Sequence, residues 1–216
     1  MKTTLICFDL WETLVTEPLT PVSCFKVLVD AYPHTVSWPK VRELIAQILH
    51  KKDQPTKRSI IEILEHFGVT DGTLASEITS QWEYSSDQVK LFPEVLEVLR
   101  YLREKGFKLG LVTNTSCYGW EATNKKFLLD SYFDYLALSF RLGRVKPEPE
   151  IFEFIERESG FSGGEITMVG DSYKNDFEAP RKRGWESSLV DRFETNVHPE
   201  AKPVVRSLLQ LRDTLL

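Results

Sequence analysis

The chain opens with a short apolar run from Leu5 to Phe8 that contains a β-branched and an aromatic residue. Such a run predicts a buried strand. It stops at Asp9, which is followed by a turn that reaches Thr13. An ionised carboxylate fits poorly inside a strand, but the carboxyl end of a central parallel strand is where open α/β sheets bind ligands. Asp9 is therefore the first candidate for chemistry.

After this turn the hydrophobic pattern changes from strand to helix. Apolar positions recur at helical spacing in four successive stripes, which predicts four amphipathic helices with no strand between them. The stripes begin at Val22, Val41, Ile60 and Leu74. Each helix has one apolar face to bury, which favours a small bundle. We expect residues 16–88 to form a helical cap domain, and residues 1–15 and 89–216 to form the core domain.

The second half of the chain alternates between strand and helix patterns. Strands are predicted near residues 108–112, 135–139, 166–169 and 187–190, each followed by a helical stretch. The last helix is predicted from Val204, Leu208, Leu211 and Leu215. Alternation at short intervals predicts a parallel, doubly wound sheet. We therefore assign the chain to the α/β class, with a small four-helix-bundle cap.

Size and charge narrow the possible functions. A chain of 216 residues suits one domain, or one with a sizeable insertion, since domains run to roughly 100–200 residues. The net charge is −5 with both signs interspersed, so the basic stripe that nucleic acid requires is missing. No apolar run reaches the ~18 residues of a membrane span. With a core strand so near the start, no signal peptide is expected, and we expect a cytoplasmic monomer or homodimer.

The cysteines add no site of their own. Cys7, Cys24 and Cys117 are an odd number at wide spacing. This spacing matches neither the paired ligands of a zinc site nor a disulfide framework. We expect three reduced thiols.

Three predicted strands end in polar groups, at Asp9, at Thr113 and at Gly170-Asp171. Because the carboxyl ends of parallel strands lie side by side, these residues should converge on one pocket. Two carboxylates there repel each other unless a cation is present. Asp9 and Asp171 are thus natural ligands for Mg²⁺, which prefers oxygen. Asp176 follows on the next helix, where it either points at the same edge or only caps the helix start.

Two further positions suit an anionic ligand. Thr113, followed by Asn114, offers a hydroxyl and backbone N–H groups that can bind an anionic oxygen, although a threonine at a strand end is also common without any role. Lys146 precedes Pro147, and proline reduces the entropy lost in aiming the ammonium inward. Near Asp9, that ammonium would hold a phosphoryl group and neutralise charge in the transition state; in an ordinary surface loop it would only be solvated.

The order of these residues resembles the four motifs of the haloacid dehalogenase-like (HAD) hydrolase superfamily. The matching stretches are Asp9-x-x-x-Thr13, Thr113-Asn114, Lys146-Pro147, and Gly170-Asp171-Ser172 with Asp176. The resemblance covers nearly the whole chain, and residues 16–88 take the place of a helical cap. It implies a Rossmann-like core.

The resemblance also implies roles for the matched residues. Asp9 would be the nucleophile and would form a covalent aspartyl intermediate, while Thr113 and Lys146 would orient the phosphoryl group. We further expect Asn114 and Glu12 to contact the substrate, although Glu12 is not part of the matched motifs. Mg²⁺ would be held by Asp9, the backbone carbonyl of Trp11 and Asp171, with Asp176 supporting the metal site or Lys146.

The resemblance breaks at Trp11. Family phosphatases carry an aspartate at this position that protonates the leaving oxygen and later activates water, and Glu12 stands where glycine is common. An indole N–H does not titrate usefully, and general acid–base catalysis is worth about 10²–10⁴ in rate. A phosphomonoesterase built on this site should be slow unless Glu12, or a cap residue such as Glu17, supplies the proton.

Three functions follow from this pattern. The first is a Mg²⁺-dependent phosphatase that acts on a small phosphorylated metabolite, with low or substrate-assisted turnover. The second is an L-2-haloacid dehalogenase, since those enzymes also carry an aromatic residue at the position of Trp11, although they generally lack the aspartate that matches Asp171. The third is a non-catalytic binding or regulatory protein. The metal carboxylates favour the first, and the sequence does not identify the substrate.

Overall fold

A computed structural model describes residues 3–20, 22–194, 198 and 201–214 of the chain. Its centre is a six-stranded sheet in the order β5-β4-β1-β6-β7-β8. The strands are β1 (Leu5–Phe8), β4 (Lys108–Thr113), β5 (Tyr135–Leu138), β6 (Ile166–Gly170), β7 (Glu186–Val190) and β8 (Val204–Val205). All five neighbouring pairs are parallel.

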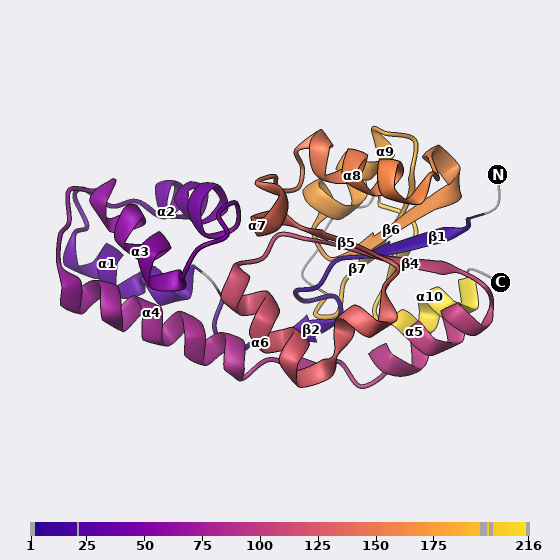
Figure 1. The fold of residues 1–216 in the computed structure, drawn as a ribbon, viewed down its shortest axis with the longest axis horizontal. Coiled ribbons are helices and arrows are strands. Elements are labelled where there is room, and N and C mark those ends of the chain that lie inside the picture. Colours follow the sequence, from indigo (N-terminus) through magenta and orange to yellow (C-terminus); the bar gives the residue numbers. More distant parts are fainter. Residues whose placement is uncertain (1–2, 21, 195–197, 199–200, 215–216) are drawn as a thin grey trace.

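Helices cover both faces of this sheet (Figure 1). On one face lie α5 (Val95–Glu104), α6 (Cys117–Phe127) and α10 (Leu208–Thr214). The other face carries α8 (Pro149–Ser159) and α9 (Ala179–Arg181), which continues a π-helix over Tyr173–Glu178. A one-turn helix, α7 (Ser139–Leu142), follows β5. The predicted doubly wound α/β fold is therefore confirmed.

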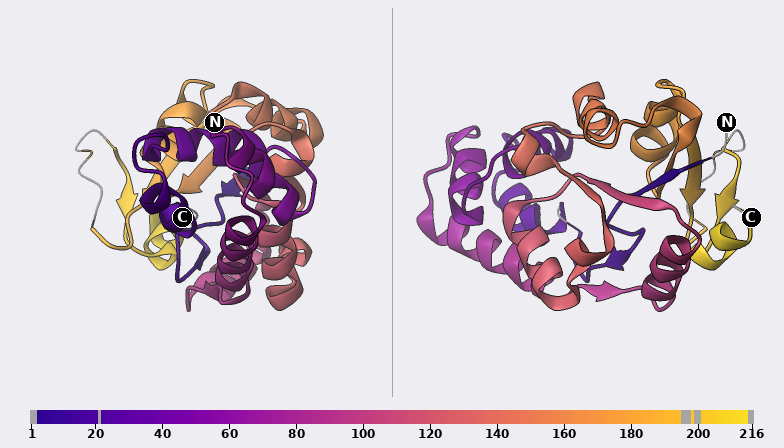
Figure 2. Two further views of the ribbon diagram at one scale, coloured as in Figure 1. Left: turned by 90° about the vertical axis from the view of Figure 1, so that its left-hand side faces the viewer. Right: turned by 45° about the vertical axis from the view of Figure 1, so that its right-hand side comes forward.

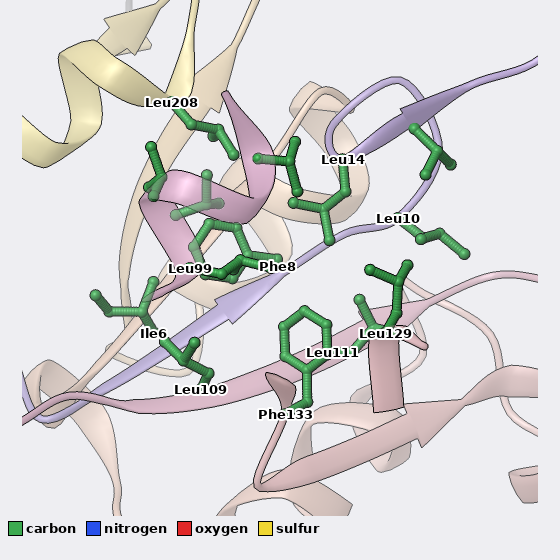
Figure 3. Close-up of a cluster of buried hydrophobic side chains, with 14 of the residues drawn as sticks. Ile6, Phe8, Leu10, Leu14, Leu99, Leu109, Leu111, Leu129, Phe133 and Leu208 are labelled. Carbon is green, nitrogen blue, oxygen red and sulfur yellow. The ribbon is translucent and has the colours of Figure 1, made fainter. Parts of the chain in front are cut away.

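The central position of β1 in the sheet explains why the opening run of the chain is apolar without interruption. Ile6 and Phe8 point into the layer that contains Leu99 of α5, as Figure 3 shows, whereas Leu5 and Cys7 belong to the cluster on the opposite face. Successive side chains of a strand point to opposite faces. Because both faces are covered, every residue of β1 is buried, as is typical of central parallel strands.

A helical segment lies beyond one end of the sheet (Figures 1 and 2). A short 3-10 turn (Ser23–Phe25) leads into α1 (Lys26–Ala31), α2 (Trp38–Leu44) with a π-helical continuation (Ile45–Leu49), α3 (Thr56–Glu65) and α4 (Gly72–Asp87). These helices stand at the four predicted places. They share a hydrophobic cluster that extends from Cys24 to Trp82 and includes no residue of the sheet. That this segment acts as a cap stays a prediction.

Two short strands lie where the chain enters and leaves the helical segment. Strand β2 (Val15–Thr16) pairs antiparallel with β3 (Lys90–Leu91), with Val15 opposite Leu91. The pair brings together the two points at which the chain passes between the sheet and the helical segment. The sequence did not predict these strands, because two residues are too few to show the alternation of apolar and polar positions that marks a strand.

The prediction of a helix starting at Val204 is wrong. Val204 and Val205 form β8, which pairs in parallel with Leu189 and Val190 of β7. Stiff β-branched side chains favour a strand, and Val205 is buried against the core. The helix begins only at Leu208, and Leu215 lies outside the described residues.

Two smaller expectations concern membranes and thiols. Within the described ranges, no helix has both the length and the apolar character needed to cross a membrane. Cys7, Cys24 and Cys117 are all free cysteines, as expected.

The topology fixes where a ligand can bind. From β1 the sheet grows through β4 and β5 in one direction, and through β6, β7 and β8 in the other. Ligands of open α/β sheets bind at the carboxyl ends of the strands where this direction reverses. In this chain that edge is formed by β1, β4 and β6, and it faces the helical segment (Figure 1).

Candidate active site

Four of the predicted site residues meet at this edge. The side-chain nitrogen of Lys146 lies 2.7 Å from Oδ1 of Asp9 and 2.6 Å from Oδ1 of Asp176. Asp9, Asp171 and Asp176 each offer a carboxylate oxygen, and these oxygens lie within 4.8 Å of one another. Lys146 is only 4% exposed, which excludes the solvated surface lysine considered from the sequence.

Asn114 holds the loop that carries Lys146. Its side-chain Nδ2 donates to the carbonyl oxygen of Lys146 at 2.9 Å, and its Oδ1 accepts from the backbone N–H of Lys146 at 2.7 Å. Both ends of the amide therefore position the lysine. The expected contact between Asn114 and a substrate stays a prediction.

Asp176 is tied to Lys146 and to the end of β6. Its Oδ1 accepts from Lys146, and its Oδ2 accepts from the backbone N–H of Ser172 at 3.0 Å. The following helix is capped by the Ser172 hydroxyl, which accepts from the N–H of Asn175. Asp176 is therefore not the cap of this helix. That it supports the metal site or Lys146 stays a prediction.

The absence of a side chain at Gly170 makes room for Asp176. The sequence analysis did not predict this role of Gly170. A Cβ atom placed on Gly170 would lie 2.4 Å from Cγ and 2.5 Å from Oδ2 of Asp176. The Cβ of Asp176 would be equally close, at 2.5 Å, so no side chain fits there unless the whole Asp176 side chain moves. The only sequence signal was a glycine directly before Asp171 at a predicted strand end.

The site holds more negative than positive charge. Burial raises the pKa of Asp171 to about 8, with the charges of Asp9 and Asp176 adding to the effect. Burial and Asp9 raise the pKa of Asp176 to about 6, although Lys146 opposes them. Burial alone would lower the pKa of Lys146, but Asp176 and Asp9 outweigh it and leave this pKa above its ordinary value. One ammonium does not neutralise three carboxylates.

This donor set fits a hard divalent cation. Carboxylate oxygens are the ligands that Mg²⁺ prefers, and the surplus charge around Asp171 favours a cation there. The oxygens of Asp176 are engaged by Lys146 and Ser172. Asp9 and Asp171 are therefore better placed than Asp176 to hold the ion directly.

Two buried threonine hydroxyls lack a hydrogen-bond partner within the described part of the chain. Oγ1 of Thr113, at the end of β4, and Oγ1 of Thr13 are fully buried and have no hydrogen-bond partner among the described residues. Leaving a buried hydroxyl unsatisfied costs about 1–3 kcal/mol. An anionic group bound beside Asp9 would give these hydroxyls acceptors.

Trp11 and Glu12 form the turn after Asp9. The indole of Trp11 packs on the first turn of α6, where a Cβ on Gly119 would lie 3.2 Å from its Cζ2. Glu12 adopts a left-handed backbone with φ of 53°, and its Oε1 accepts from the Thr16 hydroxyl at 2.9 Å. Metal binding by the Trp11 carbonyl and substrate contact by Glu12 stay predictions.

A cavity of about 130 Å³ lies beside Trp11. Its walls come partly from the core, at Trp11, Glu12 and Asn114, and partly from the helical segment, at residues that include Glu17, Cys24, His50 and Trp82. The indole N–H of Trp82 donates to Oγ of Ser116 at 3.2 Å and so joins the two parts. No sequence pattern indicated His50, because its importance arises only from packing between segments.

Comparisons with known proteins identify the family of this chain. The family model for haloacid dehalogenase-like hydrolases matches residues 6–190. Pyrophosphatase PpaX from Bacillus cereus is 27% identical over 195 residues, which are 88% of this chain and 84% of that protein. Glyceraldehyde 3-phosphate phosphatase from Methanopyrus kandleri is 30% identical over 120 residues, which are 55% of this chain and 51% of that protein.

Solved structures show the same fold. A HAD phosphatase from Thermococcus onnurineus has a TM-score of 0.64 and 26% identity, over 100% of this chain and 98% of that one. A 2-haloacid dehalogenase from Pseudomonas syringae has a TM-score of 0.67 and 24% identity, over 99% and 98% of the two chains, and is similar in fold. With the family model spanning most of the sequence, the chain belongs to the haloacid dehalogenase-like hydrolase family.

Proposed function

We propose that this hydrolase is a Mg²⁺-dependent phosphatase that acts on a small phosphorylated metabolite through an aspartyl-phosphate on Asp9. The observation that carries the proposal is the contact of the Asp9 carboxylate with Lys146, beside Asp171 and Asp176. The similar proteins from Bacillus cereus and Methanopyrus kandleri are named for phosphoryl hydrolysis, which supports the same chemistry here.

Each residue of the site has its own role in the proposed reaction. Asp9 attacks phosphorus, while the Lys146 ammonium keeps the carboxylate oriented and offsets charge that develops on the phosphoryl oxygens. The hydroxyls of Thr113 and Thr13 donate to those oxygens. Asp176 and Asn114 act through Lys146, which they hold in place.

Mg²⁺ would be held by Asp9, the carbonyl of Trp11 and Asp171. When bound, it supplies positive charge that draws the anionic phosphoryl group toward the carboxylates. The excess of acidic groups over Lys146 supports its presence.

We also propose that residues 16–88 act as a cap over the site. The cavity beside Trp11 takes its walls from both segments. Besides the bond from Trp82 to Ser116, Lys51 of the helical segment pairs with Glu148, two residues after Lys146. Such contacts exclude water from the reacting groups.

The test is phosphate release with Mg²⁺ from a panel of small phosphate esters. Wild type should release phosphate, Asp9→Asn should lose that activity, and Asp171→Ala should weaken Mg²⁺ binding measured by calorimetry. Asp130→Asn changes an exposed aspartate on the surface of the core domain, and this variant should behave as wild type. Equal release by wild type and Asp9→Asn, or Mg²⁺ binding unaffected by Asp171→Ala, would count against the proposal.

Trp11 favours one competing activity. A halide leaves without a proton, so 2-haloacid hydrolysis needs no acid at this position. Halide release from a 2-haloacid without added metal, in an Asp9-dependent way, would replace the phosphatase proposal with dehalogenation.

A further inference from the structure

The cavity beside Trp11 has walls that are mainly apolar or uncharged. The rings of Trp11 and Trp82 and the side chain of Leu19 contribute apolar surface. Burial raises the pKa of the Cys24 thiol to about 11 and lowers the pKa of His50 to about 4. Both groups are therefore neutral near pH 7, and His50 offers an uncharged imidazole to a ligand.

The size of the cavity limits what enters it. Its volume is about 130 Å³, whereas an engineered apolar cavity of about 150 Å³ binds benzene. A group with about the bulk of one six-membered ring therefore fills it.

The charges around the cavity exclude an anionic occupant. None of the described residues in its wall is lysine or arginine, while Glu12 and Glu17 both line it. Lys90 lines a separate surface depression, which Glu17 also borders. A carboxylate or phosphate in the cavity would be desolvated without a partner, which is costly. The charges therefore exclude an anionic occupant, and the apolar surface of Trp11, Trp82 and Leu19 favours an uncharged one.

Glu17 is the proton donor that this wall offers. Its Oε2 accepts from the Ser85 hydroxyl at 3.4 Å. Burial raises the pKa of Glu17 to about 7. The hydrogen bond from Ser85 lowers this pKa, and the charge of Glu12 raises it by a smaller amount. Cys24 and His50, which share the cavity, add no positive charge. Glu17 therefore still carries its proton in a large fraction of molecules near neutral pH, as a general acid requires.

We propose that the substrate is a phosphate monoester of a small, uncharged, mainly apolar alcohol or phenol, whose organic group occupies this cavity, and that Glu17 protonates its leaving oxygen in place of the acid that Trp11 replaces. The inference rests on the proposed phosphatase function.

The reaction balances as follows. Oδ of Asp9 forms a bond to phosphorus, the bond from phosphorus to the ester oxygen breaks, and that oxygen takes both the electron pair and the proton of Glu17 to leave as a neutral alcohol. The Glu17 carboxylate then takes a proton from the water that attacks the aspartyl-phosphate. Inorganic phosphate leaves, and both Asp9 and Glu17 return to their starting states.

The test compares two esters of one ring size in Glu17→Gln. Benzyl phosphate releases a poor leaving group that needs a proton, whereas para-nitrophenyl phosphate releases a stable anion that does not. We expect kcat/KM for benzyl phosphate to fall by about 10²–10⁴-fold, and that for para-nitrophenyl phosphate by less than about tenfold. The retained second activity shows that the variant is folded. Glu77→Gln, an exposed carboxylate on α4, should match wild type with both esters.

Two further measurements sharpen the test. In wild type, kcat for benzyl phosphate should fall above about pH 7, where Glu17 loses its proton, and this limb should vanish in Glu17→Gln. Wild type should also prefer benzyl phosphate to pyrophosphate, whose leaving group is an anion.

The outcomes distinguish a failure of this inference from a failure of the proposed phosphatase function. Equal losses with both esters, no loss with either, or a preference for pyrophosphate would overturn the inference while Asp9-dependent phosphate release still stood. Failure of wild type to release phosphate from any ester, para-nitrophenyl phosphate included, would overturn the phosphatase proposal and the inference together.

Discussion

The close approach of Asp176 to Gly170 makes Gly170→Ala a sharp test of the site geometry. The added methyl group would lie 2.4 Å from Cγ and 2.5 Å from Oδ2 of Asp176. The Cβ of Asp176 is equally close, at 2.5 Å. The whole Asp176 side chain must therefore move away, and the contact with Lys146 at 2.6 Å and the hydrogen bond from Ser172 at 3.0 Å are lost with it.

Two effects set the size of the loss. Inserting a methyl group into a packed interior costs about 1–3 kcal/mol. Losing one partner of a buried ion pair costs about 3–5 kcal/mol, but Lys146 keeps Asp9 as a partner, and burial already disfavours the charge on Asp176. The ion-pair loss should therefore fall below that range. We expect the free energy of unfolding to drop by about 3 kcal/mol, a large share of the roughly 5–15 kcal/mol of a typical domain.

Urea unfolding without Mg²⁺, followed by tryptophan fluorescence, measures this change. Gly72→Ala is the matched control, because a Cβ on Gly72 meets nothing within 4 Å. It should leave stability unchanged or raise it by up to about 1 kcal/mol, since alanine favours the helix that begins there. In an Asp176→Gly background the Cβ, Cγ and Oδ2 atoms that clash with the added methyl group are all absent, so adding Gly170→Ala should cost less than about 1 kcal/mol. A loss below 1 kcal/mol in the single variant, or additive losses in the double variant, would refute the reasoning.

Three further predictions use the same unfolding assay. The pKa of Glu17 rises from its ordinary value of 4.5 to about 7 on folding, so its stabilising effect is complete below pH 4.5 and is lost as the pH rises through 7. Relative to wild type, Glu17→Gln should therefore gain up to about 3 kcal/mol between pH 4.5 and pH 8, and a constant difference would contradict this. Glu12→Gly should change stability by less than about 1 kcal/mol, because relief of the left-handed backbone offsets the entropy of glycine; a larger loss would show that the Glu12 side chain stabilises the turn. Thr113→Val should raise the free energy of unfolding by about 1 kcal/mol because it removes an unsatisfied hydroxyl, yet it should weaken inhibition by inorganic phosphate; unchanged inhibition would place the phosphoryl group elsewhere.

The arrangement of the core could be predicted because it depends on local patterns. The apolar run before Asp9 and the alternating strands and helices determine a parallel sheet, and a parallel sheet brings the strand ends at Asp9, Thr113 and Asp171 to one edge. The position of Lys146 followed from its motif, and the structure brings its ammonium between two carboxylates.

Other features depend on contacts between distant segments, which local patterns do not record. The need for glycine at position 170 comes from Asp176 on the next helix. His50 enters the cavity only through packing of the helical segment on the core. Val204 was misassigned because a short edge strand and the first turn of a helix share the same apolar spacing, and pairing with β7 decides between them.

Chemical trapping of the intermediate tests the central claim most directly. Wild type would be mixed with Mg²⁺ and para-nitrophenyl phosphate, quenched in acid within one turnover, digested and analysed by mass spectrometry. The account predicts that the peptide containing Asp9 gains the mass of one phosphoryl group, and that Asp9→Asn gains none. Phosphate release with no such adduct, or with the phosphoryl group on another residue, would contradict Asp9 as the nucleophile.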